Sequence, residues 1–394
     1  MSTAEPVYIV AARRTPIGAF QGALAPLSAP QLGAAAVRAA LERSGIGAEQ
    51  VDEVLLGCVL PAGLGQAPAR QAAIGAGLPT RVPATTINKV CGSGMKAAMI
   101  GCDAIRAGSA RVVVAGGFES MSNAPYLLPK VRSGLRLGHG ELLDHMFYDG
   151  LQNPSDGALM GHFADVTARK YSFSRDQQDA FAAESVRRAL VACDSGAFSA
   201  ELVAVTVKSR KGEQIVDTDE PPYGCDINKI PQLKPAFSKE GTVTAASSSS
   251  IADGAAALVL VSESAMRALG AVPLARVVAY ASHAHEPEWF TTAPAGAIQR
   301  VLQAAAWRAQ DVDLYEINEA FAVVTMAAMR DVALPHEKVN VNGGACALGH
   351  PIGASGARII ATLVHALKTR KLQRGIASLC IGGGEATAIA IELA

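Results

Sequence analysis

Two cysteines and one histidine stand at glycine-flanked turns, where a side chain can be presented to a substrate. Cys91 lies in Val90-Cys-Gly-Ser-Gly94, between a strand-like segment and the predicted start of a helix. The N–H groups at a helix start carry partial positive charge, which favours a thiolate. We therefore predict that the pKa of Cys91 lies well below the value of about 8.5 of a free thiol. The alternative is a small apolar cysteine buried at a tight turn.

His350 and Cys380 occur in comparable surroundings near the end of the chain. His350 follows a glycine and precedes a proline, and Cys380 ends a strand-like run before Gly382-Gly-Gly384. Free N–H groups in such glycine turns can form an anion-binding nest. If the turns of Cys91 and His350 face one another, two thiols and an imidazole share one pocket. A nucleophile with a base beside it is typical of covalent acyl transfer.

Asn318 is a weaker candidate for a chemical role. It follows the predicted strand Leu314–Ile317 and is expected to open a helix over Glu319–Met329. Asparagine is a favoured N-cap, which by itself explains its presence. The glycines at 382–384 do not fit the dinucleotide-binding fingerprint, and His283-Ala-His285 is better explained as a solvated turn. We therefore expect neither a metal site nor a bound dinucleotide.

Two stretches far apart in the sequence follow the same order of helix, strand, glycine-rich turn, helix, strand and glycines. Cys91 comes 39 residues after Asp52, and His350 comes 37 residues after Asp313. This matched spacing favours an internal duplication over chance similarity of two α/β segments. The predicted elements are 32–43, 51–56, 95–105 and 111–117 in the first stretch, and 298–307, 312–317, 359–367 and 376–384 in the second.

The segment 121–250 differs from both stretches because it is rich in prolines and glycines, and only Arg175–Ala192 in it has the pattern of a long helix. We interpret this segment as a loop domain inserted into an α/β fold. The predicted organisation is a first half made of residues 1–120 and 251–274, the inserted domain at 121–250, and a second half at 275–394.

The composition excludes several classes of protein. The 394 residues include 35 Lys plus Arg and 35 Asp plus Glu, so the basic surplus of a nucleic-acid-binding protein is missing. Half of the residues are hydrophobic, but no run approaches the ~18 apolar residues of a membrane span. The N-terminal segment resembles no signal or transit peptide, and the seven cysteines have neither disulfide nor zinc spacing. We expect a cytoplasmic protein with reduced thiols and no nucleic-acid or membrane partner.

Several segments together resemble the signature motifs of the thiolase family. They are Asn88-Lys-Val-Cys-Gly-Ser-Gly-Met-Lys-Ala97, Asn318-Glu-Ala-Phe-Ala322, Gly349-His-Pro-Ile-Gly-Ala-Ser-Gly-Ala-Arg358, Cys380-Ile-Gly-Gly-Gly384 and, near the N-terminus, Ala12-Arg-Arg-Thr-Pro-Ile-Gly18. The resemblance extends from about residue 6 to the C-terminus, and Lys89 with the Gly-Met-Lys sequence resembles the acetyl-CoA acetyltransferase branch. It implies two duplicated α/β halves in five layers, α-β-α-β-α, with an inserted loop domain.

The resemblance also implies a reaction, the reversible condensation of two acetyl-CoA to acetoacetyl-CoA and CoA through an S-acetyl-cysteine, without a cofactor. Cys91 would be the nucleophile, and His350 would take its proton and later polarise the second thioester. Cys380 would remove an α-proton from the second acetyl-CoA. Asn318 would hold a water that forms one oxyanion hole with His350, and the N–H groups of Cys91 and Gly382 would form the other.

Contacts with coenzyme A follow from the same resemblance. Ser249 matches the serine that binds the pantetheine chain, and Phe237, Lys229 and Met160 are further candidates for contacts with the substrate. The chain departs from the family pattern at Ser247–Ser250 (often Asn-Ala-Ser-Gly), at Gly224 (a common arginine) and at Leu159 (a histidine).

Two other functions stay open beside acetyl transfer between acetyl-CoA molecules. One is a thiolase of broader chain length that cleaves 3-ketoacyl-CoA. The other is a non-catalytic carrier of acyl-CoA or lipid, which would not need Cys91, Asn318, His350 and Cys380 together. Residues 121–145 are rich in Leu, Met and Tyr, and such a surface segment requires a covering surface. The resemblance implies pairing of dimers into a homotetramer by such loops, and the alternative is a lid over the chain's own site.

Overall fold

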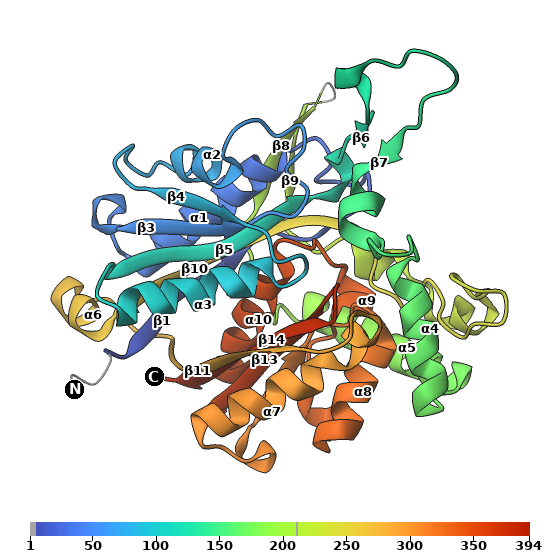
Figure 1. Ribbon diagram of the computed structural model, residues 1–394. Helices are drawn as coiled ribbons and strands as arrows, with labels where there is room; N and C mark the ends of the chain where they lie inside the picture. Colours follow the sequence, from blue (N-terminus) through green and yellow to red (C-terminus); the bar gives the residue numbers. More distant parts are fainter. Residues whose placement is uncertain (1–4, 210–211) are drawn as a thin grey trace.

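The first half of the chain forms a mixed sheet in the order β4-β3-β5-β10-β1 (Figure 1). The computed structural model describes residues 5–209 and 212–394. β3 is parallel to β4 and β5, whereas β10 is antiparallel to β5 and β1. Every residue of β10 is buried, as expected for an apolar strand at the centre of a sheet. The bounds are β1 Val7–Arg14, β3 Glu53–Gly57, β4 Ala84–Ile87, β5 Val112–Ser120 and β10 Ala252–Ser262.

The second half repeats this topology in the order β12-β13-β14-β11. β12 is parallel to β13, and the remaining pairs are antiparallel. A parallel bridge from Val339 to Tyr315 takes the place beside β12 that β4 takes beside β3. Both halves therefore have the same strand order, as the matched spacing predicted. The bounds are β11 Ala275–Ala284, β12 Leu314–Ile317, β13 Arg374–Ile381 and β14 Glu385–Leu393.

A short pairing joins the two sheets. Val7–Ile9 of β1 pair with Ala275–Val277 of β11, so the strands form one ten-stranded sheet within the described residues. β2 (Gly18–Ala19) pairs with the start of β10. Because only three residues of each strand take part, the two halves of the sheet can stack with helices between them (Figure 1).

The helices complete five layers, α-β-α-β-α, and confirm the predicted fold (Figure 1). α1 and α2 pack on the outer face of the first sheet, and α7 and α8 pack on the outer face of the second. α3 and α10 lie between the sheets in a core of aliphatic side chains. The bounds are α1 Ala29–Ser44, α2 Pro68–Gly75, α3 Ser93–Arg106, α7 Ala293–Ala305, α8 Ala322–Val332 and α10 Ser355–Arg370.

The segment between β5 and β10 covers one end of this core. It contains α5 (Arg175–Asp194), the predicted long helix, but also α4 (Met160–Tyr171), which the prediction missed. α4 starts directly after an extended Leu159 without a side-chain cap, so no start signal was readable. The segment also contains four short strands: β6 Tyr126–Leu127, β7 Leu143–Asp144, β8 Val205–Ser209 and β9 Gly212–Val216. Two short helices lie outside it, α6 Glu263–Leu269 after β10 and α9 Ala345–Leu348 before α10.

A buried ion cluster fastens this segment to the first sheet. The guanidinium of Arg14, at the end of β1, donates to both carboxylate oxygens of Asp219 at 2.7 and 2.8 Å. Its Nε also donates to Glu201 at 2.5 Å, and all three side chains are buried. Bidentate pairing of this kind satisfies a buried arginine. The part of the inserted segment around Glu201 and Asp219 is therefore held close to the core.

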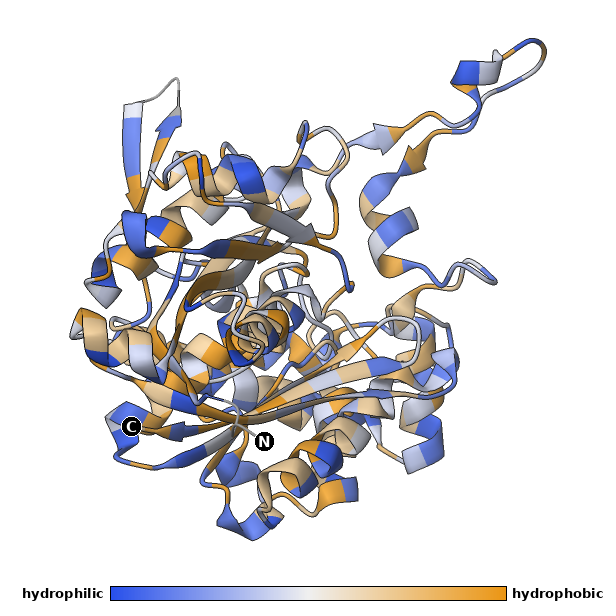
Figure 2. Ribbon diagram, turned by 60° about the vertical axis from the view of Figure 1, so that its left-hand side comes forward, coloured by the Kyte–Doolittle hydropathy of each residue, from blue (hydrophilic) through white to orange (hydrophobic). Residues whose placement is uncertain are grey.

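One part of the segment projects from the body as a narrow arm that begins and ends in β6 and β7 (Figures 1 and 2). Several apolar side chains of this arm are exposed: Tyr126, Leu128, Val131, Leu135, Leu137 and Leu142. The tip of the arm points away from the body of the molecule in both views, so it does not lie over the rest of the chain as a lid would (Figures 1 and 2). In the part of the chain that the structure describes, no helix is long and apolar enough to cross a bilayer.

Glycines allow α3 and α10 to approach within backbone contact. A Cβ on Gly94 would lie 2.9 Å from the backbone nitrogen of Ala357 and 3.0 Å from the carbonyl oxygen of Gly353. A Cβ on Gly356 would lie 2.3 Å from the backbone nitrogen of Met95. Real Cβ atoms do not tolerate such distances, and neither contact involves a flexible side chain. The first turns of both helices therefore need glycine.

We predict that Gly356→Ala lowers the free energy of unfolding by about 1–3 kcal/mol, because one methyl group must push the two helices apart. Urea denaturation measures this change. Gly47→Ala is the matched control, since no atom lies within 4 Å of its added Cβ. Its free energy of unfolding should stay within about 0.5 kcal/mol of the wild type. Equal unfolding midpoints for the two variants would contradict the close packing of α3 on α10.

Candidate active site

Four predicted residues come together where the two halves meet. Cys91 lies in the turn between β4 and α3, and His350 lies in the turn between α9 and α10. Cys380 is the penultimate residue of β13, and Asn318 directly follows the neighbouring strand β12. These strands are parallel, so their carboxyl ends lie at one edge of the sheet. The fold thus places two turns and two strand ends around one point.

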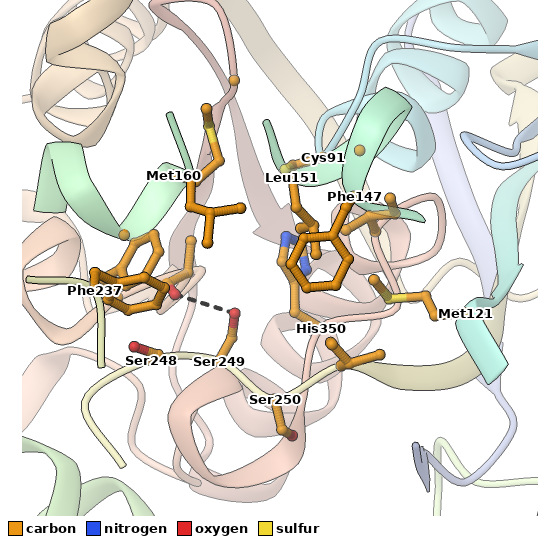
Figure 3. A pocket seen from close by; sticks show the side chains of 18 of the residues that line it. Cys91, Met121, Phe147, Leu151, Met160, Phe237, Ser248, Ser249, Ser250 and His350 are labelled. Carbon is orange, nitrogen blue, oxygen red and sulfur yellow. Dashed lines mark hydrogen bonds between the residues drawn. The ribbon is translucent and has the colours of Figure 1, made fainter. Parts of the chain in front are cut away.

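A pocket of about 190 Å³ lies at this point, and Cys91, His350 and Gly382 line it. His350 is 6% exposed, whereas Cys380 and Asn318 are completely buried. Figure 3 shows the side chains of Cys91 and His350 close together within the pocket. The remaining side chains are mainly apolar and include Met121, Phe147, Leu151, Leu159, Met160, Phe237, Phe290, Phe321 and Ile352.

The turn that carries Cys91 is conformationally strained. Val90 has a φ of +46°, which a β-branched residue rarely adopts. Ser93 stabilises the turn, because its Oγ donates to the carbonyl of Val90 at 2.6 Å and accepts from the N–H of Lys89 at 2.8 Å. A Cβ on Gly92 would lie 2.4 Å from Ile381, so this glycine lets the turn approach the end of β13. The position of Cys91 is therefore set by both halves.

The electrostatics of Cys91 differ from the sequence-based prediction. Burial raises its pKa to about 11, although the N–H groups of Gly382 and of Cys91 itself favour the thiolate. The expected low pKa is therefore wrong. The prediction rested on the helix start, but desolvation of the thiol exceeds that effect, and the imidazole opposite is neutral in the resting site. The resting group is a neutral thiol.

His350 is also neutral. Burial and the nearby charge of Arg358 lower its pKa to about 3. The Oγ of Ser355 donates to the carbonyl of Pro351 at 2.9 Å, so it accepts from His350 Nδ1 at 2.5 Å. This hydrogen bond places the imidazole proton on Nδ1, so Nε2 carries the lone pair. The imidazole can therefore accept a proton at Nε2.

Asn318 is not the N-cap of a helix, which corrects the prediction. α8 begins at Ala322 after an extended Phe321, because the preceding residues pair with the serine segment instead. The N–H of Ser249 donates to the carbonyl of Ala320 at 3.0 Å, and Ser248 forms an antiparallel bridge with Phe321. The Nδ2 of Asn318 lies 3.5 Å from His350 Nε2. Asn318 is thereby available to the site rather than to a helix end.

Cys380 and Gly382 complete the site from β13. Burial and the adjacent Cys91 raise the pKa of Cys380 well above that of an ordinary thiol. Gly382 presents its N–H to the thiol of Cys91. The arrangement therefore contains a nucleophile, a proton acceptor beside it, a second thiol and backbone N–H groups that can stabilise negative charge.

Comparison with known proteins agrees with this arrangement. Residues 7–264 match the model of the thiolase N-terminal domain, and residues 271–393 match that of the thiolase C-terminal domain. The chain belongs to the thiolase family. The boundary between the two matches falls between β10 and β11, where the structure passes from one sheet to the other.

Thiolase relatives cover nearly the whole chain. An acetyl-CoA acetyltransferase of Pseudomonas aeruginosa is 51% identical over 387 residues, which are 98% of each chain. Proteins of the same name from Cupriavidus necator and Escherichia coli are each 50% identical, over 98% of this chain and 99% and 98% of their own lengths. The aligned regions therefore include both halves and the inserted segment 121–250.

Three of the four predicted coenzyme A contacts line the thiolase pocket. They are Ser249, Phe237 and Met160. The Oγ of Ser249 donates to the carbonyl of Ala320 at 3.1 Å, the hydrogen bond drawn in Figure 3. The fourth residue, Lys229, is not among the lining residues. Its side chain is 72% exposed and lies 3.3 Å from the carboxylate of Asp226.

The sequence analysis missed most of the apolar lining. Phe321 lies within a quoted motif, but Phe147 and Leu151 come from one π-helical turn and Phe290 from a short 3-10 helix, and none of these has a distinct sequence pattern. Their common feature is visible only in three dimensions. In the described residues, no three His, Cys, Asp or Glu side chains are grouped as a metal site would require.

We predict that alkylation of Cys91 by iodoacetamide accelerates continuously up to at least about pH 9, because the thiol stays largely protonated below its pKa of about 11. Mass spectrometry of the peptide that contains Cys91 measures the rate. A small thiol with a pKa of about 8.5 serves as the reference. A plateau in the rate below about pH 8 would show that the resting group is a thiolate instead.

Proposed function

We propose that the chain is an acetyl-CoA C-acetyltransferase, which condenses two acetyl-CoA to acetoacetyl-CoA and CoA and also catalyses the reverse reaction. The observation that carries this proposal is the pairing of Cys91 with the neutral imidazole of His350, next to the second thiol of Cys380. Relatives named acetyl-CoA acetyltransferase, which are 51% and 50% identical to the chain over 98% of its length, support the choice of substrate.

In the first half-reaction the acetyl group moves from CoA to Cys91. His350 Nε2 takes the thiol proton while sulfur attacks the thioester carbonyl. The N–H groups of Cys91 and Gly382 stabilise the resulting oxyanion. CoA leaves as a thiolate and takes a proton from Cys380, which becomes a thiolate. The acyl-enzyme then contains the imidazolium of His350, whose formation a neutral resting imidazole allows.

In the second half-reaction a second acetyl-CoA reacts with the S-acetyl group. The thiolate of Cys380 removes an α-proton, and His350 together with a water held by Asn318 stabilises the enolate oxygen. The enolate carbon attacks the acetyl carbonyl, and the C–S bond to Cys91 breaks. The Cys91 thiolate recovers its proton from His350. Protons balance over the cycle, because Cys380 is again a thiol. No metal or redox cofactor takes part in this scheme.

We predict that His350→Ala and Cys380→Ser fail at different steps. His350→Ala should slow the acetylation of Cys91, since no base then accepts its proton. Cys380→Ser should still be acetylated, because CoA is a good leaving group, but its turnover should fall by about 10²–10⁴-fold. Quenched-flow mass spectrometry with acetyl-CoA measures the first step, and formation of acetoacetyl-CoA measures the second.

Cys91→Ser is the control, because it should take up no acetyl group under the same conditions. If wild-type protein takes up none either, covalent acetyl transfer is refuted. If both variants lose acetylation to the same extent, the division of roles between His350 and Cys380 is wrong although the reaction remains.

We also propose that the protein is a cytoplasmic homotetramer of D₂ symmetry. All seven cysteines are free, which supports a reducing compartment. The projecting arm supports assembly, because its apolar side chains are exposed and Leu137 is 99% exposed. Exposed apolar patches of this kind mark surfaces that another protein surface covers. Pairing of dimers through the arms would bury them within a closed assembly.

We predict that deletion of residues 124–140 converts the tetramer to active dimers, because it removes the exposed apolar surface but no pocket residue. Light scattering measures the mass. Leu137→Asp should weaken the tetramer, whereas Val272→Asp, at a 75% exposed position outside the arm, should not. A monomeric wild type would refute the assembly, and a tetrameric deletion variant would refute the role of the arm.

A further inference from the structure

Arg358 is a buried charged residue that the reaction scheme does not use. It lies in α10 beneath the site and is 2% exposed. Its NH1 lies 3.8 Å from the carboxylate of Glu316, and its Nε and NH1 have no hydrogen-bond partner. One carboxylate oxygen of Glu316 is unpartnered as well. Buried polar groups in folded proteins are normally satisfied, so this pair requires an explanation.

Arg14 shows how the same chain satisfies a buried arginine. Its guanidinium donates to Asp219 at 2.7 and 2.8 Å and to Glu201 at 2.5 Å. Arg358 has no contact of that quality. A loosely paired buried charge gives little or no net stability, because desolvation of the ions offsets their attraction. The fold therefore gains little from Arg358, and its position points to the adjacent site.

The contact of Arg358 with Asn318 indicates what it does there. NH2 of Arg358 lies 3.5 Å from Oδ1 of Asn318, and a guanidinium can only donate. The carboxamide is thereby oriented with its oxygen toward Arg358 and its NH₂ group toward His350 Nε2, at 3.5 Å. With the amide reversed, its NH₂ group would face the guanidinium, and its oxygen would face the lone pair of Nε2. Both contacts would then be repulsive.

We propose that Arg358 is a positioning residue of the second half-reaction, which holds the amide of Asn318 so that its NH₂ group faces His350 and can hold the water of the oxyanion hole that the two residues share. This inference rests on the proposed function. After burial, the charge of Arg358 also contributes to the low pKa of His350. Both effects act through other side chains, since Arg358 is not among the residues that line the pocket.

The test compares Arg358→Met and Arg358→Lys with the wild type in both half-reactions. Arg358→Met should lower turnover in condensation by about 10–10²-fold, because one oriented donor of an oxyanion hole is lost. Its KM should change by less than about threefold, and its rate of Cys91 acetylation should not fall, since the N–H groups of Cys91 and Gly382 are retained and a higher pKa makes His350 a stronger base. Arg358→Lys retains a cation and should have intermediate turnover.

A double variant separates positioning from a general structural role. Arg358→Met combined with Asn318→Ala should turn over no more slowly than Asn318→Ala alone, because the two residues act as one unit. Additive losses would overturn the proposal. Equal losses in the two half-reactions of Arg358→Met would also overturn the proposal. If Arg358→Met does not fold, equal losses in the two half-reactions of Arg358→Lys overturn it instead.

The acid limb of the pH–rate profile gives a second readout. Removal of the Arg358 charge should raise the pKa of His350, so the limb should move to higher pH in Arg358→Met and stay near the wild type in Arg358→Lys. The other ionisable groups around His350 are Cys91, Cys380 and Glu119, whose carboxylate accepts from Gly353 in the same turn at 3.0 Å. Burial raises the pKa of Glu119 to about 7, and Arg358 is not among the causes of that shift, so the difference between profiles is the readout.

The result for the wild type distinguishes the two proposals. Absence of Cys91 acetylation in the wild type would refute the proposed function. Normal acetylation and condensation in the wild type, together with unchanged condensation and an unmoved acid limb in Arg358→Met, would refute only the role of Arg358.

Discussion

The backbone contact between the first turns of α3 and α10 is the constraint on which the site depends. These helices carry the turns of Cys91 and His350, and they can meet only because Gly94 and Gly356 lack side chains. The stacked sheets hold the pair from both sides. Two residues more than 250 positions apart in the sequence thereby share one pocket. A duplicated fold is well suited to this, since each half supplies one turn and one strand end.

Burial then determines the chemical state of the groups that are brought together. The thiols of Cys91 and Cys380 and the imidazole of His350 are all neutral in the resting site, because desolvation disfavours their charged forms. The apolar lining maintains this condition. Charge is created only when substrate arrives, next to fixed N–H groups that stabilise it. This differs from a site that stores a reactive thiolate.

Two buried arginines illustrate different uses of charge in one core. Arg14 is fully paired and fastens the inserted segment to β1, which is a structural role. Arg358 is loosely paired and faces Asn318, which is typical of a residue retained for the site. The unpartnered atoms of Arg358 and Glu316 lower the stability of the fold, and in our proposal the charge of Arg358 orients Asn318 in return.

Local sequence was sufficient to predict the paired halves, the elements that carry the site, and Cys91, Asn318, His350 and Cys380. Element periodicity and motif residues are short-range features that need no knowledge of the folded chain. The sequence did not reveal the protonation states, the start of α8 at Ala322 or the distance of Lys229 from the pocket. Each of these depends on desolvation or on hydrogen bonds between segments far apart in the sequence. Only the tertiary structure decides them, because the burial of a group is a property of everything packed around it.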